Sequence, residues 1–456
     1  MEEVMDKYVG IFEGTLMYLT NKKCNILMEK EENGENSYRF FTINQTGRNI
    51  MECITGNTST GNLIKKFCNI NAIPMEENQD WILEFIYSLK EKGAVYLADE
   101  PIAEHCIKVI GEEKLISPMH ATVEITETCN LRCRHCYLDA SVLKDKCISF
   151  KQFEEIVNQL KENKVVNIEL TGGELFMNPE AYEIVQLALK QFAMVGILTN
   201  GTILTEAMLA LLSNFKEKVL LNVSLDSVNP QLHDDFRGQK GAFDKTCETI
   251  KRLTGKGLNV RVASSIFRDN MWEIDKLADL AVSLGARVFT YNFVEDFGRG
   301  NQVSSAKTDK STEVKNYTDY INGVIRKYRN IIPVIQSDDF ISGSSNCGAG
   351  TVSILIGADG NLRPCALFPK IQGLGNINKE KFSDIFQKEI YKLIADIKPP
   401  SEANGCPNSC KYLYHCRGCY LKGLEKNKDS VQPCSWINFN RLEPVLEFYK
   451  GNLNYV

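Results

Sequence analysis

The cysteines of this chain are grouped, and their grouping constrains its structure more than any other feature of the sequence. Of the sixteen, three lie at 129–136, two are Cys347 and Cys365, and five lie at 406–434. The other six stand alone, as small buried hydrophobic residues often do: Cys24, Cys53, Cys68, Cys106, Cys147 and Cys247. Grouped cysteines indicate either disulfides or bound metal, and the compartment decides between the two.

The N-terminus carries acids where a secretory signal needs a basic start followed by an apolar stretch. No apolar run approaches the roughly 18 residues that a membrane span needs, so we expect a cytoplasmic protein without a membrane partner. Thiols stay reduced in that compartment, which favours metal or cluster binding over disulfides. The net charge of −5 also argues against a nucleic-acid partner.

The composition is that of a globular protein with several domains. Its content of 43% hydrophobic and 24% charged residues excludes a disordered chain or a coiled-coil rod. A length of 456 residues suggests about two to four domains. Changes of pattern along the chain predict four segments, with bounds 1–110, 111–305, 306–345 and 346–456. The third of these is expected to be a linker with a bridging helix.

The first segment is expected to be a small α+β domain of winged-helix-like shape. A β-rich run at 38–44 predicts a strand, and apolar residues at helical spacing predict helices near 46–54, 60–67 and 80–89. A short strand is expected from residue 93. The segment has no basic recognition face, so its shape does not indicate DNA binding.

The second segment alternates β-branched apolar runs with amphipathic stretches. Six strands are expected, at 121–126, 165–170, 195–198, 219–225, 260–266 and 288–293. Ser149 and Gln152 form a capping-box signature at the start of the first intervening helix. This order predicts an α/β fold with a parallel sheet, in the form of a partial (β/α)6 barrel. The chemistry of such barrels lies at the C-terminal ends of the strands.

Three cysteines, Cys129, Cys133 and Cys136, follow the first barrel strand with the spacing Cys-x3-Cys-x2-Cys. Three thiolates on one loop can bind three irons of a cubane cluster and leave the fourth iron open. A structural zinc ion is the alternative, but a closed zinc site needs four ligands and no fourth lies nearby. The loop therefore predicts an iron–sulfur cluster with one open position.

This motif, placed after the first strand of a partial β/α barrel, resembles that of the radical S-adenosylmethionine (SAM) enzymes. In that family the open iron binds the amino and carboxylate groups of SAM, and reductive cleavage gives a 5′-deoxyadenosyl radical. Gly172, Gly173 and Glu174 resemble the family's GGE motif, which holds the SAM amino group. The turn at 199–201 is expected to shape the pocket rather than to bind SAM.

Further SAM contacts are implied by the same resemblance. Ser224 and Asp226 end the fourth strand and resemble residues that contact the SAM ribose or carboxylate, and Arg237 resembles the arginine that pairs with that carboxylate. His135 stands where many members have an aromatic residue near the adenine, with Tyr137 next in line. A role for His135 as a metal ligand is the less favoured alternative.

The cysteine-rich segment, 346–456, includes a predicted hairpin turn at Asp359-Gly360. Its cysteines resemble those of the SPASM extension, which carries two auxiliary [4Fe–4S] clusters. The spacing within 406–419 is x3, x5, x2, where the family has x2, x5, x3. The resemblance implies that the first auxiliary cluster is bound by Cys347, Cys365 and Cys419. It implies that the second is bound by Cys406, Cys410, Cys416 and Cys434.

These seven ligands are one fewer than two closed clusters need. An open iron in the first auxiliary cluster could bind a substrate thiolate and orient its sulfur. One of the six isolated cysteines is an alternative source of the missing ligand, and two zinc sites are an alternative to both clusters.

Over essentially its whole length the chain resembles the thioether-forming (sactipeptide and ranthipeptide) maturases of ribosomally made peptides. The stretches MHATVEITETCNLRCRHCYL, SLDSVNPQLHDDFRG and CRGCYLKGL carry the resemblance. It implies SAM and three [4Fe–4S] clusters as cofactors. It also implies a cysteine-containing precursor peptide, bound through its leader by 1–110, and a flavodoxin- or ferredoxin-type electron donor.

The expected function is to join a cysteine sulfur to a carbon of the same peptide. Formation of carbon–carbon links or epimerisation is the alternative within this fold, and a non-enzymatic iron–sulfur redox sensor is the alternative from another class. Glu295, Asp296 and Arg299 end the sixth strand, where they either line the substrate side or form structural ion pairs.

Overall fold

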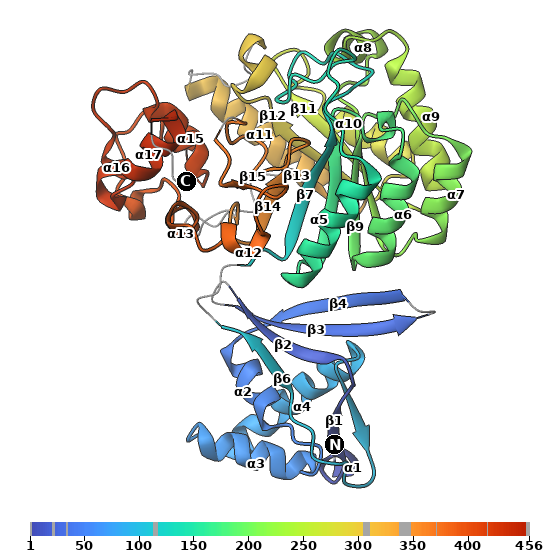
Figure 1. Ribbon diagram of the computed structural model, residues 1–456, viewed down its shortest axis with the longest axis vertical. Coiled ribbons are helices and arrows are strands. Elements are labelled where there is room, and N and C mark those ends of the chain that lie inside the picture. The colour runs from blue at the N-terminus through green and yellow to red at the C-terminus, as the bar shows by residue number, and fades with distance from the viewer. Residues whose placement is uncertain are drawn as a thin grey trace. The chain divides into compact units, whose positions relative to one another are not determined.

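The computed structural model describes residues 2–20, 23–32, 35–112, 117–303, 311–336, 348–370, 372–416 and 418–452. They form two compact units, Met1–Ser117 and Pro118–Val456. The sheets of each unit are its own (Figure 1). Each unit also has its own apolar core.

The described part of the first unit combines two small sheets with four helices. Its larger sheet has the order β4-β3-β2-β6, and its smaller sheet pairs β1 with β5. The strands are β1 (Tyr8–Ile11), β2 (Thr15–Thr20), β3 (Lys23–Glu32), β4 (Glu35–Ile43), β5 (Val95–Ala98) and β6 (Lys108–Gly111). The helices are α1 (Glu2–Met5), α2 (Gln45–Cys53), α3 (Thr60–Ile70) and α4 (Met75–Glu91).

The expected strand near 38–44 and the three expected helices of this unit are present. Asn44 and Ser59 cap α2 and α3 by accepting hydrogen bonds from the amides of Gly47 and Asn62. The apolar stripes of the helices are buried in the core of the unit. Strands β1, β2, β3 and β6 are additional to the elements expected from the sequence.

The second unit is built on one sheet of ten strands, in the order β13-β12-β11-β10-β9-β8-β7-β14-β15-β16. Its centre consists of the six expected strands, which are parallel. They are β7 (His120–Thr126), β8 (Asn167–Gly172), β9 (Met194–Thr199), β10 (Val219–Ser224), β11 (Asn259–Ile266) and β12 (Val288–Phe293). The predicted α/β class and strand order are therefore confirmed.

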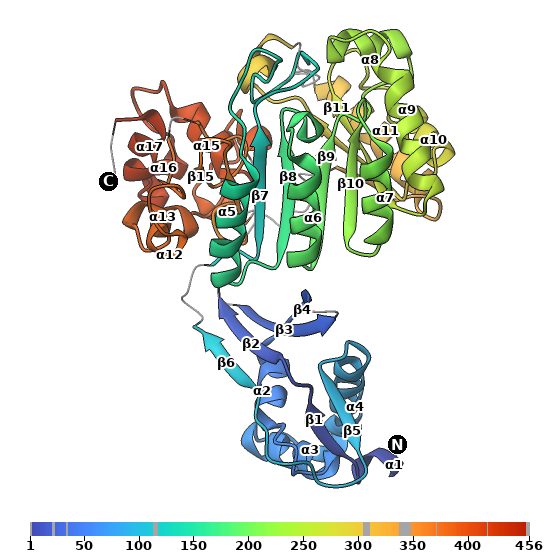
Figure 2. The same cartoon turned by 45° about the vertical axis from the view of Figure 1, so that its right-hand side comes forward.

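Helices follow these strands and cover one face of the sheet, as Figure 2 shows for α5, α6 and α7 beside β7 to β10. They are α5 (Phe150–Glu162), α6 (Ala181–Gln191), α7 (Glu206–Asn214), α8 (Pro230–Arg237), α9 (Ala242–Gly255), α10 (Ile274–Ser283) and α11 (Ser311–Tyr328). The predicted capping box of Ser149 and Gln152 is present at the start of α5.

Side chains alternate between the two faces of this sheet. In β10, Val219, Leu221 and Val223 are buried, whereas Leu220, Asn222 and Ser224 between them are half-buried. The inner face is polar in part, since Arg261 Nε of β11 donates to Asn222 Oδ1 at 3.2 Å. One face is thus packed against helices, and the other is accessible to solvent and to a ligand.

The cysteine-rich segment shares this sheet, which the sequence did not predict. Strand β14 (Ser353–Ile356) pairs in parallel with β7, and β15 (Asn361–Arg363) pairs with β14 in an antiparallel hairpin. The predicted turn lies between them, with Gly360 at φ +80°. Two short strands, β13 (Val334–Gln336) and β16 (Gly375–Asn376), end the sheet.

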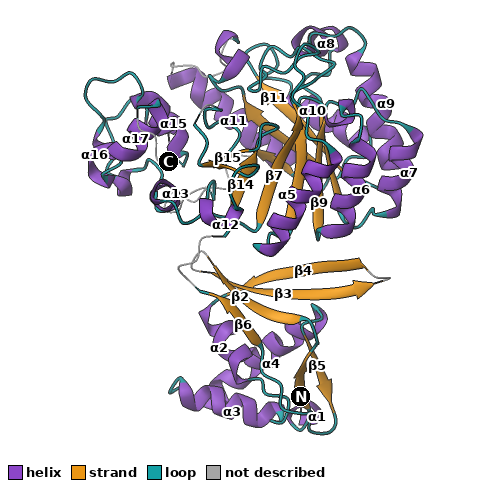
Figure 3. Ribbon diagram, in the orientation of Figure 1, coloured by secondary structure: helices purple, strands orange, loops and turns teal. Residues whose placement is uncertain are grey.

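The remaining C-terminal elements are short helices joined by loops (Figure 3). They are α12 (Phe382–Ile385), α13 (Glu389–Ala395), α14 (Leu413–Cys416), α15 (Tyr420–Asn427), α16 (Ser435–Asn440) and α17 (Glu443–Lys450). The described residues also form three 3-10 turns: η1 (Leu175–Met177), η2 (Gly298–Gln302) and η3 (Glu402–Asn404). Among the helices of the described residues, none is long and apolar enough to cross a membrane.

The core of the large sheet should be sensitive to truncation at Ile168 of β8, whose side chain is 0% exposed. We expect Ile168→Ala to lower the free energy of unfolding by about 2–5 kcal/mol, because it removes buried carbons and leaves a cavity. Ile331→Ala is the matched control, since Ile331 is 61% exposed in the same unit. Thermal unfolding of both variants checks this, and equal shifts of the midpoint would contradict it.

Candidate functional site

The three cysteines of the loop after β7 lie together. Burial raises the pKa of Cys129 to about 12, and the nearby Cys133 and Cys136 add to this shift. Backbone amides donate to two of the sulfurs: Leu131 to Cys129 Sγ and Ala140 to Cys136 Sγ, each at 3.4 Å. The loop gathers three thiols where a bare thiolate is penalised, so a bound cation would stabilise their ionised form.

Two neighbouring segments fix the shape of this loop. The guanidinium of Arg299 donates to the carbonyl of Cys133 at 2.8 Å and to Asp139 Oδ1 at 2.5 Å. At the end of α8, the carbonyl of Arg237 accepts from the amide of Arg132 at 3.2 Å. Arg299 thus holds the cysteine loop through an ion pair and backbone contacts. This matches the structural ion pair that was one of the two roles expected for it.

The Gly172-Gly173-Glu174 motif lies directly beside the cysteine loop. The amide of Gly173 donates to the carbonyl of Thr126 at 2.6 Å, and the amide of Glu174 to that of Thr128 at 2.9 Å. A Cβ atom on Gly173 would overlap the carbonyl oxygen of Thr128. The glycine is therefore required for the close approach of two backbones.

The Glu174 carboxylate is buried and held by the end of β9. Its Oε1 accepts from Thr199 Oγ1 and its Oε2 from the amide of Asn200, both at 2.8 Å. Burial raises the pKa of Glu174 to about 7, against the lowering effect of these hydrogen bonds. The 199–201 turn therefore positions Glu174, in keeping with a role that shapes the pocket.

Asp226, Arg237 and Ser224 lie at the end of β10 and on α8. Arg237 Nε donates to Asp226 Oδ2 at 2.5 Å, and its Nη1 lies 3.9 Å from Cys133 Sγ. Burial alone would raise the pKa of Asp226, but Arg237 overrides it and the pKa is lowered. Ser224 is half-buried. A positive charge thus lies beside the cysteine loop, with its own carboxylate partner.

His135 takes part in an aromatic stack that the sequence did not indicate. Its ring lies 4.5 Å from that of Phe236 with an interplanar angle of 5°, and Phe236 stacks on Phe267 at 4.0 Å. Burial lowers the pKa of His135 to about 3, so the ring is neutral. Its buried Nδ1 has no hydrogen-bond partner among the described residues.

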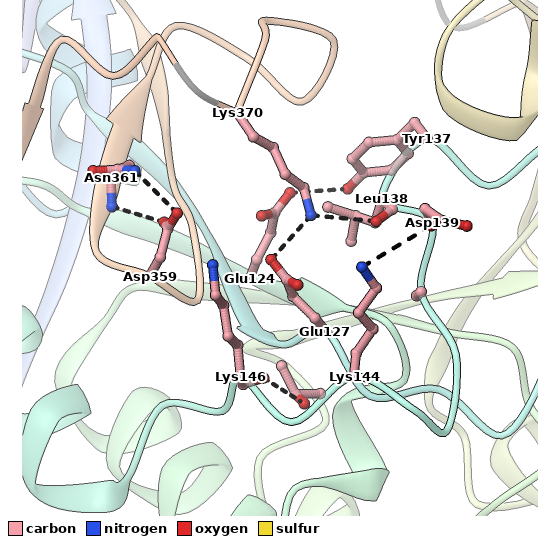
Figure 4. Close-up of polar contacts among 12 residues, drawn as sticks. Glu124, Glu127, Tyr137, Leu138, Asp139, Lys144, Lys146, Asp359, Asn361 and Lys370 are labelled. Atoms are coloured by element: carbon pink, nitrogen blue, oxygen red, sulfur yellow. Dashed lines mark hydrogen bonds and ion pairs between the residues drawn. The ribbon is translucent and has the colours of Figure 1, made fainter.

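Tyr137 belongs to a polar network that joins the cysteine loop to the hairpin β14–β15. Its hydroxyl donates to Glu124 Oε1 at 3.3 Å, and Arg363 Nη2 donates to Glu124 Oε2 at 2.6 Å. Lys370 Nζ contacts Glu127 Oε1 at 3.0 Å (Figure 4). Sequence reasoning identified Tyr137 but not its partner Glu124, nor the contact of Glu124 with Arg363, which is 239 positions away in the chain.

The C-terminal cysteines lie in two places. Burial raises the pKa of Cys416 to about 12, and nearby Cys410, Cys434 and Cys406 raise it further, so these four are neighbours. Cys365 and Cys419 lie near Tyr449 instead, where both contribute to raising the pKa of its hydroxyl after burial and Glu425. Cys347 lies outside the described residues. No group of three or more His, Cys, Asp or Glu in those residues is arranged to hold a single metal ion.

The three polar residues after β12 have different surroundings. Arg299 is paired with Asp139. Glu295 Oε1 lies 2.7 Å from Lys422 Nζ, and Glu295 is among the charges that influence the pKa of Cys419. Asp296 is exposed and lines a cavity.

Comparison with known proteins identifies the family. Residues 123–281 match the model of the radical SAM superfamily, and 347–420 match that of an iron–sulfur cluster-binding domain, SPASM. The chain is 37% identical to the antilisterial bacteriocin subtilosin biosynthesis protein AlbA of Bacillus subtilis, over 90% of this chain and 91% of that protein. The chain belongs to the radical SAM superfamily. It is an enzyme, as predicted, with SAM and [4Fe–4S] clusters as its cofactors.

Other relatives agree with this placement. The chain is 26% identical to the sporulation killing factor maturation protein SkfB of B. subtilis, over 63% of this chain and 69% of that protein. The structure of Streptococcus suis SuiB bound to its precursor peptide SuiA matches with a TM-score of 0.61 at 16% identity. That match covers 92% of this chain and 97% of SuiB, and it shows a shared fold.

The residues present fit the cofactors of this radical SAM enzyme. The loop gathers the buried thiols of Cys129 and Cys133 and the half-buried thiol of Cys136, and two of the three sulfurs accept from backbone amides. Glu174 and the Asp226–Arg237 pair offer a buried carboxylate and a guanidinium, which are complementary to the amino and carboxylate groups of SAM.

The tight contact at Gly173 predicts a steric effect on SAM binding. We expect Gly173→Ala to weaken SAM binding at least tenfold, because the methyl group displaces the cysteine loop from Glu174. Gly255→Ala is the control, since its Cβ meets nothing within 4 Å and alanine favours the helix by roughly 1 kcal/mol. Equilibrium dialysis with SAM checks both variants, and wild-type affinity for Gly173→Ala would contradict the role of the motif.

Proposed function

We propose that this enzyme joins cysteine sulfurs to carbons of the same ribosomally made precursor peptide, forming thioether cross-links. The observation that carries the proposal is the similarity to AlbA over nine-tenths of both chains, at 37% identity. AlbA is named for its part in the biosynthesis of a bacteriocin.

The peptide undergoes a two-electron oxidation. One S–H and one C–H bond break, one S–C bond forms, and the product is lighter than the precursor by two hydrogen atoms. When bound, the cofactors would supply a radical that takes the hydrogen atom from carbon and would accept one further electron, while the thiol hydrogen leaves as a proton.

The chain's own residues bind and orient the reactants. We assign the loop thiols Cys129, Cys133 and Cys136 to the SAM cluster. Glu174, held by Thr199 and Asn200, is assigned to the SAM amino group. Arg237, held by Asp226, is assigned to the SAM carboxylate. Ser224 is assigned to the ribose, and the neutral ring of His135 to the adenine, with Tyr137 beside it.

We assign the C-terminal cysteines to the two auxiliary clusters according to their order in the sequence. In this assignment the first cluster would be held by Cys347, Cys365 and Cys419 and could take a substrate thiolate. The second cluster would be held by Cys406, Cys410, Cys416 and Cys434. The proximity of the last four supports this division, as does the separate position of Cys365 and Cys419 beside Tyr449.

The first unit is proposed to bind the leader of the precursor peptide. Strand β4 ends the sheet β4-β3-β2-β6, and an edge strand can pair with an added peptide strand. Helix α4 lies beside it, because Lys92 Nζ at its end is 5.2 Å from the Phe41 ring centroid. We assign this role to 1–110, the SAM chemistry to 111–305, a linker to 306–345 and the auxiliary clusters to 346–456.

A flavodoxin- or ferredoxin-type donor is proposed to deliver the electron for SAM cleavage in the cytoplasm. The enzyme needs neither nucleic acid nor a membrane in this scheme.

Cysteine variants should separate SAM cleavage from product formation. We expect about twelve irons in the anaerobically reconstituted enzyme, from three four-iron clusters. Cys136→Ala should abolish SAM cleavage because it removes a ligand of the SAM cluster, whereas Cys416→Ala should retain cleavage and lose product. Iron assay and chromatography of 5′-deoxyadenosine measure both effects. Four or fewer irons in the wild type, or loss of cleavage in Cys416→Ala, would contradict the three-cluster assignment.

The function is tested by incubating the enzyme with SAM, dithionite and the peptide encoded beside its gene. We expect 5′-deoxyadenosine and a peptide lighter by two hydrogen atoms for each link, measured by intact mass. An unchanged mass despite SAM cleavage would contradict cross-linking and leave epimerisation. Absence of SAM cleavage in the wild type would contradict the assignment of Cys129, Cys133 and Cys136 to a SAM cluster.

A further inference from the structure

A cavity of about 220 Å³ in the second unit lies beside the cysteine loop at 129–136 and beside the segment that follows Cys365. One wall includes Tyr137, next to Cys136, and another includes 366–370, which follows Cys365. Asp296 and Phe297, after β12, also line it, as do Glu425 and Tyr449 of the C-terminal helices. A peptide that contacts both the cysteine loop and the segment after Cys365 would lie close to this cavity.

The cationic side chains that line the cavity are all paired with carboxylates, whereas one lining carboxylate has no cationic partner among the described residues. The positive lining residues each face an acid: Arg363 pairs with Glu124 at 2.6 Å, Lys370 with Glu127 at 3.0 Å and Lys428 with Glu425 at 4.0 Å.

The exception among the charged lining residues is Asp296. Its side chain is exposed and has no hydrogen-bond or ion-pair partner in the part of the chain that the structure describes. The cavity therefore presents an uncompensated negative charge.

The walls around this carboxylate are apolar in part. Phe297, Leu367, Phe368 and Pro369 all line the cavity. A volume of about 220 Å³ is below the roughly 300–1,000 Å³ of sites that enclose a whole small ligand, so it suits one side chain. Lysine and arginine combine an apolar stem, which packs on such walls, with a cationic head for the carboxylate.

We propose that this cavity is a specificity subsite for one lysine or arginine side chain of the precursor peptide, with Asp296 as the carboxylate that selects it. This inference rests on the proposed function, because it needs a peptide substrate. It goes further by naming the class of side chain that the peptide must carry beside its modified residues.

The test measures binding of the fluorescently labelled precursor peptide to the reconstituted enzyme with SAM and without reductant, by anisotropy. We expect Asp296→Asn to weaken binding about two- to fivefold, as for a partly exposed ion pair. One lysine- or arginine-to-glutamine variant of the peptide should lose the same factor with the wild-type enzyme. That peptide variant should lose nothing further with Asp296→Asn.

Asp396→Asn is the matched control, because Asp396 is exposed in the same unit and does not line the cavity. It should bind the peptide as the wild type does. Unchanged binding by Asp296→Asn would overturn the subsite, as would an equal loss for every peptide variant, which would indicate a contact with the peptide backbone. Product formation by the wild type is scored separately, so failure of the subsite and failure of cross-linking are distinguishable.

Discussion

The buried ion pair between Glu124 and Arg363 joins the strand before the cysteine loop at 129–136 to the hairpin that leads to Cys365. The side chains are 1% and 2% exposed, and their charged atoms are 2.6 Å apart. Glu124 lies on β7, which leads into the cysteine loop, and Arg363 lies two residues before Cys365. Removing one partner of such a pair typically costs about 3–5 kcal/mol, because the other charge stays buried. The pair therefore fixes one cysteine-bearing region against the other.

The ten-stranded sheet holds Glu124 and Arg363 close together, because both residues lie on its strands. Because β14 pairs with β7, the cysteine-rich segment continues the sheet of the barrel rather than forming a separate body. Parallel strands β7 to β10 end at one edge, where they place the cysteine loop, Glu174, Asn200 and Asp226 side by side. The sheet and the ion pair together set the distance between the cysteine loop and Cys365.

The barrel strands and the motifs at their ends were predictable from the sequence, because each is marked by residues close together in the chain. The six barrel strands are β-branched runs between amphipathic helices, and the GGE and cysteine motifs follow their ends directly. Strands β1 to β3 were missed because their sequences lack a clear period of two: β2 is buried at five of six positions. The pairing of β14 with β7 and the partners of Arg299 depend on residues more than 150 positions apart, which no local pattern records.

Thioether formation is tested most directly by the fate of the cysteines in the product peptide. After reaction the peptide is treated with reductant and iodoacetamide and analysed by tandem mass spectrometry. We predict that each linked cysteine resists alkylation, and that the loss of two hydrogen atoms maps to a fragment holding that cysteine and its acceptor residue. Alkylation of every cysteine in a peptide that has lost this mass would contradict the thioether and indicate a carbon–carbon link.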